Sequence, residues 1–297
     1  MRVLILGGSG MIGHSLYQNL TLNGFETFIT LRKDLDTYLI NGHPICDSAC
    51  AFHNLNALYP EDYIKLIKKI KPNVVINALG VINKSNTIHN LYKTVLINSA
   101  FPHYIHKFTQ EMNCKFIQIT TDCVYSGKKG NYRESDVPDP VSFYGRSKLL
   151  GDICSEGALT LRISTIGREL FNKYGLLEWF LASKDSIMGY DQAIYSGFPT
   201  NEFSSIVVDI LNNHSNLEGL FHISSDPISK YELLLLLKNE YKKNIDIIKD
   251  DSFQCDRSLN SDRYRKKTGF KPSSWIQMIK TMVKFDSENK SLYSSFP

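Results

Sequence analysis

The sequence lacks an apolar run long enough to cross a membrane, because its longest, Leu233 to Leu237, holds five residues where a helical span needs about 20. It also lacks a strong charge of either sign. A formal net charge of +4 over 297 residues tolerates an anionic ligand but does not indicate nucleic-acid binding. Internal repeats and low-complexity segments are absent as well. With an ordinary hydrophobic content of 42%, the composition indicates a globular protein that binds neither a membrane nor nucleic acid.

Cysteine is sparse, with six residues scattered at positions 46, 50, 114, 123, 154 and 255. No signal peptide precedes the first strand-like run, so we expect free thiols in a reducing cytoplasm. One cluster, His43, Cys46, Cys50 and His53, contains four groups that could bind zinc. Its spacing differs from that of common structural zinc modules, and it falls in a loop. We therefore interpret it as a coincidence and expect no metal site.

The first thirteen residues contain the strongest functional signal. The apolar run Val3 to Leu6 leads directly into Gly7, Gly8, Gly10 and Gly13, and a helical pattern follows. Glycines remove Cβ atoms where a backbone must approach a pyrophosphate, and a helix N-terminus offers free N–H groups and a partial positive charge. This arrangement of a strand, a glycine turn and a helix predicts dinucleotide binding.

Strand-like and helix-like patterns alternate along the first half of the chain. We expect strands over 25–31, 73–77, 115–120 and 160–164, and helices over 12–22, 59–70 and 91–111. This alternation predicts an α/β fold with a Rossmann-like, doubly wound parallel sheet.

The second half is less regular. We expect residues 1–165 to form the dinucleotide-binding domain, with later sheet elements around 195–215. Residues 166–297 would form mainly a smaller substrate-binding lobe, and the Ser- and Lys-rich tail would be frayed from about residue 286.

The tip of the second strand bears on the choice of cofactor. An acidic residue there would accept hydrogen bonds from the adenosine ribose and repel a 2′-phosphate. The sequence instead has Arg32 and Lys33, and Arg32 is suitably placed to pair with the phosphate. This favours NADP(H) over NAD(H). The alternative is that both residues are solvated surface cations, since Asp34 and Asp36 lie close by.

A tyrosine and a lysine are spaced to share one face of a helix. Tyr144 and Lys148 are four residues apart, so their side chains would project into the same cleft. A nearby ammonium would lower the pKa of the phenol and make it a usable acid or base. Thr121 ends a buried strand, at the edge of the sheet where ligands bind. The alternative for the pair is a surface contact without a chemical role.

Five motifs occur together and in order: the glycine turn, 77–80, 120–127, 134–140 and 144–148. With them the chain resembles the extended short-chain dehydrogenase/reductases, and most of all their dTDP-4-dehydrorhamnose reductase branch. The resemblance is close over residues 1–165 and looser in the second half.

The resemblance implies roles for individual residues. Thr121 would hydrogen-bond the substrate carbonyl, Tyr144 would give it a proton, and Lys148 would hold the nicotinamide ribose. The implied cofactor-binding residues are Gly7, Gly10, Met11, Ile12, Gly13, Arg32, Asn54, Leu55, Ala78, Gly80, Tyr144, Lys148 and Thr165. The implied substrate-binding residues are Thr121, Asp122 and Arg257. Arg257 is either a clamp on a diphosphate or a solvated charge beside Asp256, and Asn98 either organises a relay water or is an ordinary helix residue.

We therefore expect an NADPH-dependent reductase that converts a nucleotide-linked 4-keto-6-deoxy sugar to the 4-hydroxy sugar, for surface polysaccharide synthesis. The nucleotide would be dTDP, UDP or GDP. The sequence leaves open whether the chain forms a homodimer. One alternative is a sugar-nucleotide epimerase or dehydratase that retains NAD. Arg32 at the strand tip, and Cys123 in place of a second carboxylate after Asp122, argue against it. Another is a non-catalytic, NADP-binding regulatory subunit.

Overall fold

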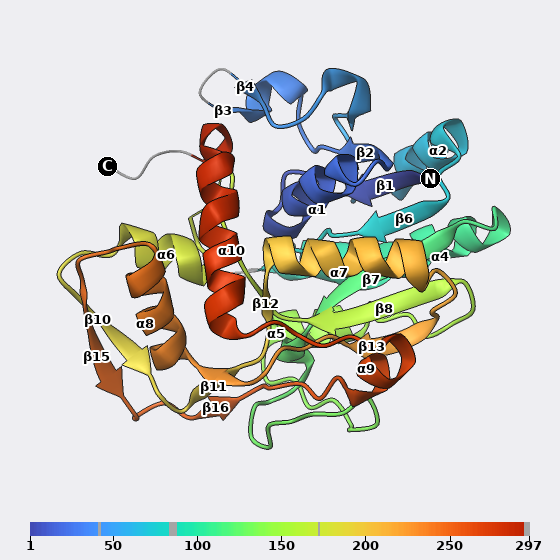
Figure 1. Ribbon diagram of the computed structural model, residues 1–297. Helices are drawn as coiled ribbons and strands as arrows, with labels where there is room; N and C mark the ends of the chain where they lie inside the picture. Colours follow the sequence, from blue (N-terminus) through green and yellow to red (C-terminus); the bar gives the residue numbers. More distant parts are fainter. Residues whose placement is uncertain (41–42, 83–87, 172, 294–297) are drawn as a thin grey trace.

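A seven-stranded parallel sheet forms the centre of the molecule (Figure 1). The computed structural model describes residues 1–40, 43–82, 88–171 and 173–293. Within these ranges the strand order is β13-β8-β7-β6-β1-β2-β5, and every neighbouring pair is parallel. The strands are β1 (Arg2–Leu6), β2 (Glu26–Thr30), β5 (Ala51–Phe52), β6 (Val74–Asn77), β7 (Lys115–Thr121), β8 (Ala158–Ile163) and β13 (Gly219–His222). The predicted α/β, doubly wound fold is confirmed.

The chain reverses its direction across the sheet between β1 and β6. It runs from β1 outward through β2 to β5, then returns to the other side of β1 and continues through β6, β7, β8 and β13. In the register of this pair Leu6 lies beside Asn77, so the two strands end together. Sheets of this kind bind ligands at such a switch point, outside the carboxyl ends of the strands. The glycine turn directly follows Leu6 and therefore lies at this point.

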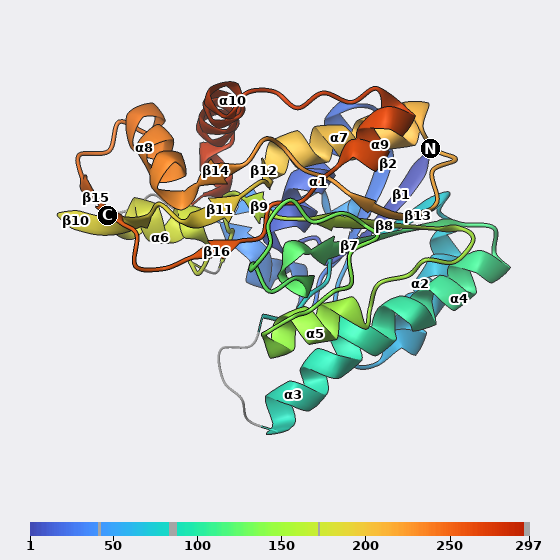
Figure 2. The same cartoon turned by 90° about the horizontal axis from the view of Figure 1, so that it is seen from below.

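Helices cover both faces of the sheet (Figure 2). The helices α1 (Met11–Leu22) and α7 (Thr200–Asn213) lie on one face, and α10 (Trp275–Glu288) packs beside α7. The helices α2 (Pro60–Ile70), α4 (Phe101–Glu111) and α5 (Phe143–Leu149) lie on the other. Because both faces are covered, every residue of β6 and β8 is buried. The helix expected over 91–111 consists of α3 (Ile88–Val95), a π-helical turn at Leu96–Ala100, and α4.

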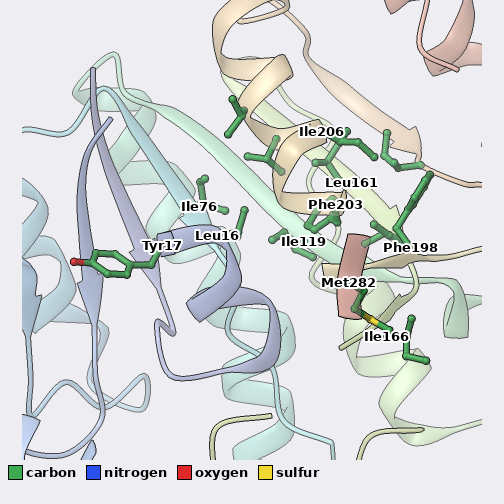
Figure 3. Close-up of a cluster of buried hydrophobic side chains, with 14 of the residues drawn as sticks. Leu16, Tyr17, Ile76, Ile119, Leu161, Ile166, Phe198, Phe203, Ile206 and Met282 are labelled. Carbon is green, nitrogen blue, oxygen red and sulfur yellow. The ribbon is translucent and has the colours of Figure 1, made fainter. Parts of the chain in front are cut away.

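One hydrophobic core continues from the sheet into the second half of the chain (Figure 3). It begins between α1 and the sheet at Leu16 and Ile76, and it includes Phe203 of α7. It then extends to Ile166 and to Met282 of α10. The sheet domain and the C-terminal lobe are thus packed against each other through shared apolar side chains.

The second half of the chain adds short helices and small sheets, most of them around the carboxyl end of the main sheet (Figure 1). Its remaining helices are α6 (Leu176–Ala182), α8 (Lys230–Glu240) and α9 (Asp262–Thr268). The strands pair as β9 (Thr165–Ile166) with β12 (Phe198–Pro199), β10 (Ser186–Tyr190) with β15 (Asp246–Asp250), and β11 (Ala193–Tyr195) between β14 (Ile228–Ser229) and β16 (Cys255–Asp256). A further pair, β3 (Leu39–Ile40) and β4 (His43–Pro44), follows β2. Most of 195–215, where sheet elements were expected, is helix α7, and the late strand of the main sheet is β13.

The expectation of a frayed tail from about residue 286 is wrong for residues 286–293. Helix α10 continues to Glu288, and the buried Asp286 accepts a hydrogen bond from the Tyr241 hydroxyl. Tyr293 is only 5% exposed, with its ring edge-on to that of His14. The polar composition of the tail did not indicate that Asp286 and Tyr293 are buried, because their partners lie far away in the sequence. No helix in the part of the chain that the structure describes is long and apolar enough to cross a bilayer.

Candidate functional site

The glycine turn forms a close backbone cradle at the N-terminus of α1. Gly7 has a φ of +92°, and a Cβ at Gly13 would lie 2.1 Å from the Gly7 carbonyl oxygen. Gly10, by contrast, has only the Gly7 oxygen near its Cβ position, at 3.4 Å. No side chain among the described residues caps α1, and its first turn, which starts with Met11 and Ile12, holds no acid. The first N–H groups of α1 therefore stay available to an anion such as a pyrophosphate.

The tip of β2 presents Arg32 to solvent, next to a cluster of polar side chains formed by Asp34, His53 and Asn54. Arg32 is exposed, whereas Asp34 Oδ1 accepts a hydrogen bond of 2.6 Å from Asn54 Nδ2 and lies 3.2 Å from His53 Nδ1. Asn54 has a φ of +61°, a conformation that asparagine tolerates better than most residues. Leu55 N–H donates to the Leu31 carbonyl at 3.0 Å, which aligns this loop with the end of β2. The amide nitrogen of Asn54 is thus engaged with Asp34, and its amide oxygen is the atom that could accept a hydrogen bond from an adenine amine.

The loop after β6 is held in place by Asn98, which lies in the π-helical turn. Its amide group exchanges two hydrogen bonds with the backbone of Val81, at 2.9 and 3.0 Å, and donates to Ser147 Oγ at 3.0 Å. Ala78 N–H donates to the Leu6 carbonyl, and Gly80 is exposed at the end of this stretch. Asn98 thus joins the β6 loop to α5 through its amide group.

Helix α5 brings Tyr144 and Lys148 against the end of β7. Ser142 caps the helix, and a Cβ at Gly145 would lie 2.1 Å from the Cys123 carbonyl oxygen, so only glycine permits this close approach. Lys148 is 4% exposed, and its Nζ donates to the Ile119 carbonyl at 2.9 Å. Burial lowers the pKa of the Lys148 ammonium to about 8. An ammonium has three donors, so Lys148 retains capacity for a ligand hydroxyl.

The expected lowering of the Tyr144 pKa by Lys148 is not found. Burial raises the pKa of Tyr144 above its usual value, the neighbouring Cys123 and Asp122 raise it further, and a hydrogen bond with Thr121 lowers it. The physical reason is that burial disfavours the phenolate, while the Lys148 ammonium is directed to the Ile119 carbonyl. Tyr144 is consequently a protonated phenol at neutral pH.

Thr121 and Asp122 lie at the end of β7, beside Arg257. Thr121 Oγ1 donates to Asp122 Oδ1 at 3.1 Å and accepts from the Cys123 N–H at 3.1 Å. Arg257 Nε donates to the Tyr125 carbonyl at 3.0 Å, and its Nη1 lies 3.9 Å from Cys123 Sγ. Burial raises the pKa of Asp122, and the charge of Arg257 opposes that shift. Arg257 is thus half-buried beside the end of β7, with its Nε held by the Tyr125 carbonyl.

Tyr195 and Ser164 are polar neighbours of this site that the sequence did not indicate. Burial raises the pKa of the Tyr195 hydroxyl, the negative charge of Asp122 raises it further, and a hydrogen bond with Ser164 opposes the shift. Tyr195 ends β11, and Ser164 directly follows β8. The sequence signal for a close approach to Tyr195 was Gly197. A Cβ at that position would lie 2.4 Å from Tyr195 Oη. Thr165, predicted to contact the cofactor, is half-buried on β9 beside Phe198.

The described part of the histidine and cysteine cluster shows no arrangement of side chains that could bind a metal ion. The described residues contain no group of three or more His, Cys, Asp or Glu side chains arranged to hold a metal ion. The side chain of His43 lies outside the described set. Cys46 and Cys50 are free thiols, and burial raises the pKa of Cys46 to about 12.

The chain matches the family model described as the RmlD substrate binding domain over residues 1–287. It is 24% identical over 306 residues to dTDP-4-dehydrorhamnose reductase of Aggregatibacter actinomycetemcomitans, covering 95% of this chain and 98% of that protein. It is 23% identical over 261 residues to methionine adenosyltransferase 2 subunit beta of Xenopus tropicalis, covering 81% of this chain and 72% of that protein.

Among solved structures, dTDP-4-dehydrorhamnose reductase of Bacillus anthracis in complex with NADP matches with a TM-score of 0.76 and 15% identity, covering 96% of this chain and 99% of that one. This likeness concerns the fold. The family model, in contrast, spans nearly the whole chain and confirms the resemblance that the motifs indicated. The protein belongs to the RmlD substrate-binding domain family, a branch of the NAD(P)-dependent oxidoreductases of the extended short-chain dehydrogenase/reductase type.

Proposed function

We propose that the protein is an NADPH-dependent reductase of a nucleotide-linked 4-keto-6-deoxy sugar. The observation that carries this proposal is the placement of Thr121, Tyr144 and Lys148 at the carboxyl edge of the sheet, beside the glycine turn at the switch point. The named activity of the Aggregatibacter relative supports the choice of substrate class. The product would be the 4-hydroxy sugar, a donor for surface polysaccharide made in the cytoplasm.

The residues present fit a nicotinamide dinucleotide. The open space at Gly10 and the uncapped start of α1 suit its pyrophosphate, which Gly7, Met11, Ile12 and Gly13 would surround. Arg32 would pair with a 2′-phosphate, and Asn54 and Leu55 would contact the adenine. Ala78, Gly80 and Thr165 would line the nicotinamide pocket, and Tyr144 and Lys148 would bind the nicotinamide ribose. The NADP complex of the Bacillus anthracis structure supports this assignment.

The side chains at the end of β7 can complete a ketone reduction. When bound, the reduced nicotinamide supplies a hydride to the carbonyl carbon. Tyr144, kept protonated by burial, gives its proton to the carbonyl oxygen, so that hydride and proton together convert the ketone to an alcohol. Thr121 Oγ1, whose hydrogen is donated to Asp122 Oδ1 without substrate, would turn that hydrogen to the same oxygen and orient it. Lys148, held by the Ile119 carbonyl, would use its remaining ammonium hydrogens to bind the nicotinamide ribose.

Asp122 and Arg257 are suited to the rest of the substrate. The Arg257 guanidinium is fixed at Nε by the Tyr125 carbonyl, and its Nη1 lies 3.9 Å from Cys123 Sγ. A guanidinium can bridge phosphate oxygens in a fork, so it would hold the diphosphate of a dTDP-, UDP- or GDP-linked sugar. Asp122 would accept a hydrogen bond from a sugar hydroxyl. The proposal is tested by NADPH oxidation with a panel of such 4-keto-6-deoxy sugars, and a lack of turnover with every member would contradict it.

Arg32→Ala should weaken NADPH binding by about 10-fold or more and leave NADH binding nearly unchanged. The reason is that the substitution removes a charge-assisted hydrogen bond to the 2′-phosphate, worth about 1.5–3 kcal/mol. Fluorescence titration with both dinucleotides measures the ratio, and Lys65→Ala on the exposed face of α2 serves as the charge-matched control. Equal losses for NADPH and NADH would show that the phosphate is not bound at Arg32.

A second candidate function is a regulatory subunit that uses the dinucleotide as a structural ligand. The similarity to methionine adenosyltransferase 2 subunit beta over 81% of the chain supports it. In that case the protein would bind NADP(H) and a stoichiometric partner enzyme, yet consume no NADPH. An epimerase or dehydratase would instead retain NAD through purification and show no net oxidation.

A further inference from the structure

The C-terminal segment reaches back to the glycine turn through one pair of side chains. Tyr293 Oη lies 3.1 Å from His14 Nε2, and His14 Nδ1 lies 2.9 Å from the carbonyl oxygen of Gly10. Both rings are buried, with exposed fractions of 5% for Tyr293 and 3% for His14. Gly10 is the N-cap of α1 and the middle glycine of the turn. The two hydrogen bonds therefore connect residue 293 to the backbone that would face a pyrophosphate.

The direction of these two hydrogen bonds follows from chemistry. A carbonyl oxygen only accepts, so His14 must carry its proton on Nδ1. Burial lowers the pKa of His14 to about 4, so the ring is neutral at pH 7 and Nε2 is an acceptor. Tyr293 is consequently the donor to Nε2. Its hydroxyl selects the tautomer of His14 that can hold the Gly10 carbonyl.

Tyr293 is itself held by groups of the C-terminal lobe. The guanidinium of Arg168 lies 4.7 Å from the centre of the Tyr293 ring. Arg168 Nε donates to Glu178 Oε1 of α6 at 2.7 Å, in an ion pair that is nearly buried on both sides. Arg168 also follows β9, the strand that holds Thr165. The position of Tyr293 thus depends on the same lobe that would bind the substrate.

We propose that Tyr293 and His14 are positioning residues that fix the glycine turn for dinucleotide binding, which makes the C-terminal segment a part of the cofactor site. The inference rests on the proposed function, in that the ligand of the turn is taken to be NADPH. Neither side chain touches the cofactor. Both act through the Gly10 carbonyl, by holding the first turn of α1 in the orientation that directs its N–H groups at the phosphates.

Tyr293→Phe tests this inference, because it keeps the ring and its packing on Arg168 but removes the donor. We expect the Kd of NADPH, measured by fluorescence titration, to rise about fivefold, the value of one lost hydrogen bond of about 1 kcal/mol. KM for NADPH should rise in parallel, while kcat and the KM of the sugar nucleotide stay unchanged. A merely structural role would lower the unfolding midpoint without separating these constants.

The matched control is Tyr241→Phe. Tyr241 is likewise a tyrosine of the C-terminal lobe whose hydroxyl donates to a buried group, here Asp286 of α10, and its hydroxyl makes no bond to His14. It should leave the Kd of NADPH within twofold of wild type. An equal rise in both variants, or no rise in Tyr293→Phe, would overturn the inference.

A double-mutant cycle gives an independent test. In a His14→Leu background the acceptor is absent, so Tyr293→Phe should have no further effect on the Kd of NADPH. A further fivefold loss in that background would show that Tyr293 acts by another route. Wild-type protein that binds neither NADPH nor NADH would overturn the proposed function, and this inference with it. Wild-type binding that Tyr293→Phe leaves intact would overturn the inference alone.

Discussion

Tyr144→Phe should lower kcat by about 100-fold or more, because it removes the hydroxyl that would protonate the carbonyl oxygen. The affinity for NADPH should fall far less than kcat, since the glycine turn and Lys148 are unchanged and only one contact to the nicotinamide ribose is lost. The change is sterically mild, because Tyr144 lies on α5 with its ring retained in the variant. Steady-state kinetics with NADPH and a 4-keto-6-deoxy sugar nucleotide measure kcat, and titration of the free protein measures the affinity.

The control for this prediction is Tyr190→Phe. Tyr190 is on β10, 36% exposed, with its ring against that of Phe253. The Tyr190→Phe variant also loses a tyrosine hydroxyl, but one that lies away from Thr121 and Lys148. Its kcat should therefore equal that of wild type. A Tyr144→Phe enzyme with wild-type turnover would remove the proton-donor role from Tyr144 and leave the mechanism without its acid.

Asp152→Asn should lower the free energy of unfolding by about 3–5 kcal/mol, since it leaves a buried arginine without its counter-charge. Asp152 Oδ2 accepts hydrogen bonds of 2.9 and 2.7 Å from Arg162, and the two side chains are only 6% and 5% exposed. Arg162 also donates to the Tyr125 hydroxyl at 2.8 Å. The pair thereby joins the segment after α5 to β8 and to the segment after β7. Urea unfolding followed by circular dichroism measures the loss.

Asp62→Asn is the matched control, because its partner Lys65 lies 3.0 Å away in a solvent-exposed pair. Such pairs contribute about 0–1 kcal/mol, so the control should unfold close to wild type. If Asp152→Asn also unfolded within about 1 kcal/mol of wild type, the Asp152–Arg162 pair would not stabilise the contact between β8 and the segment after α5.

The elements that position the site could be predicted because their signals are local. The apolar run before Gly7 and the glycines up to Gly13 predict a strand, a turn and a helix, and the structure has β1 and α1 at these places. The spacing of Tyr144 and Lys148 likewise predicts a shared helix, and both lie on α5. In each case the relevant contacts are within a few residues of one another, so periodicity and glycine placement describe them.

The contacts that the sequence did not predict join distant segments. Lys148 donates to the carbonyl of Ile119, and a backbone acceptor has no signature in the sequence, so the pKa of Tyr144 was expected to move in the wrong direction. Tyr293 and His14 are 279 positions apart, and the polar residues around Tyr293 suggested a frayed end. Arg257 could not be assigned, because its partners lie beyond β7 on another part of the chain.

The most direct test of the central claim is isotope transfer from NADPH that carries deuterium at the transferable position of the nicotinamide. The protein is incubated with this cofactor and a 4-keto-6-deoxy sugar nucleotide, and the product is examined by NMR and mass spectrometry. The account predicts a 4-hydroxy sugar with one deuterium at C4 and stoichiometric oxidation of the cofactor. Bound cofactor with no deuterium in the sugar, for every sugar nucleotide supplied, would contradict it.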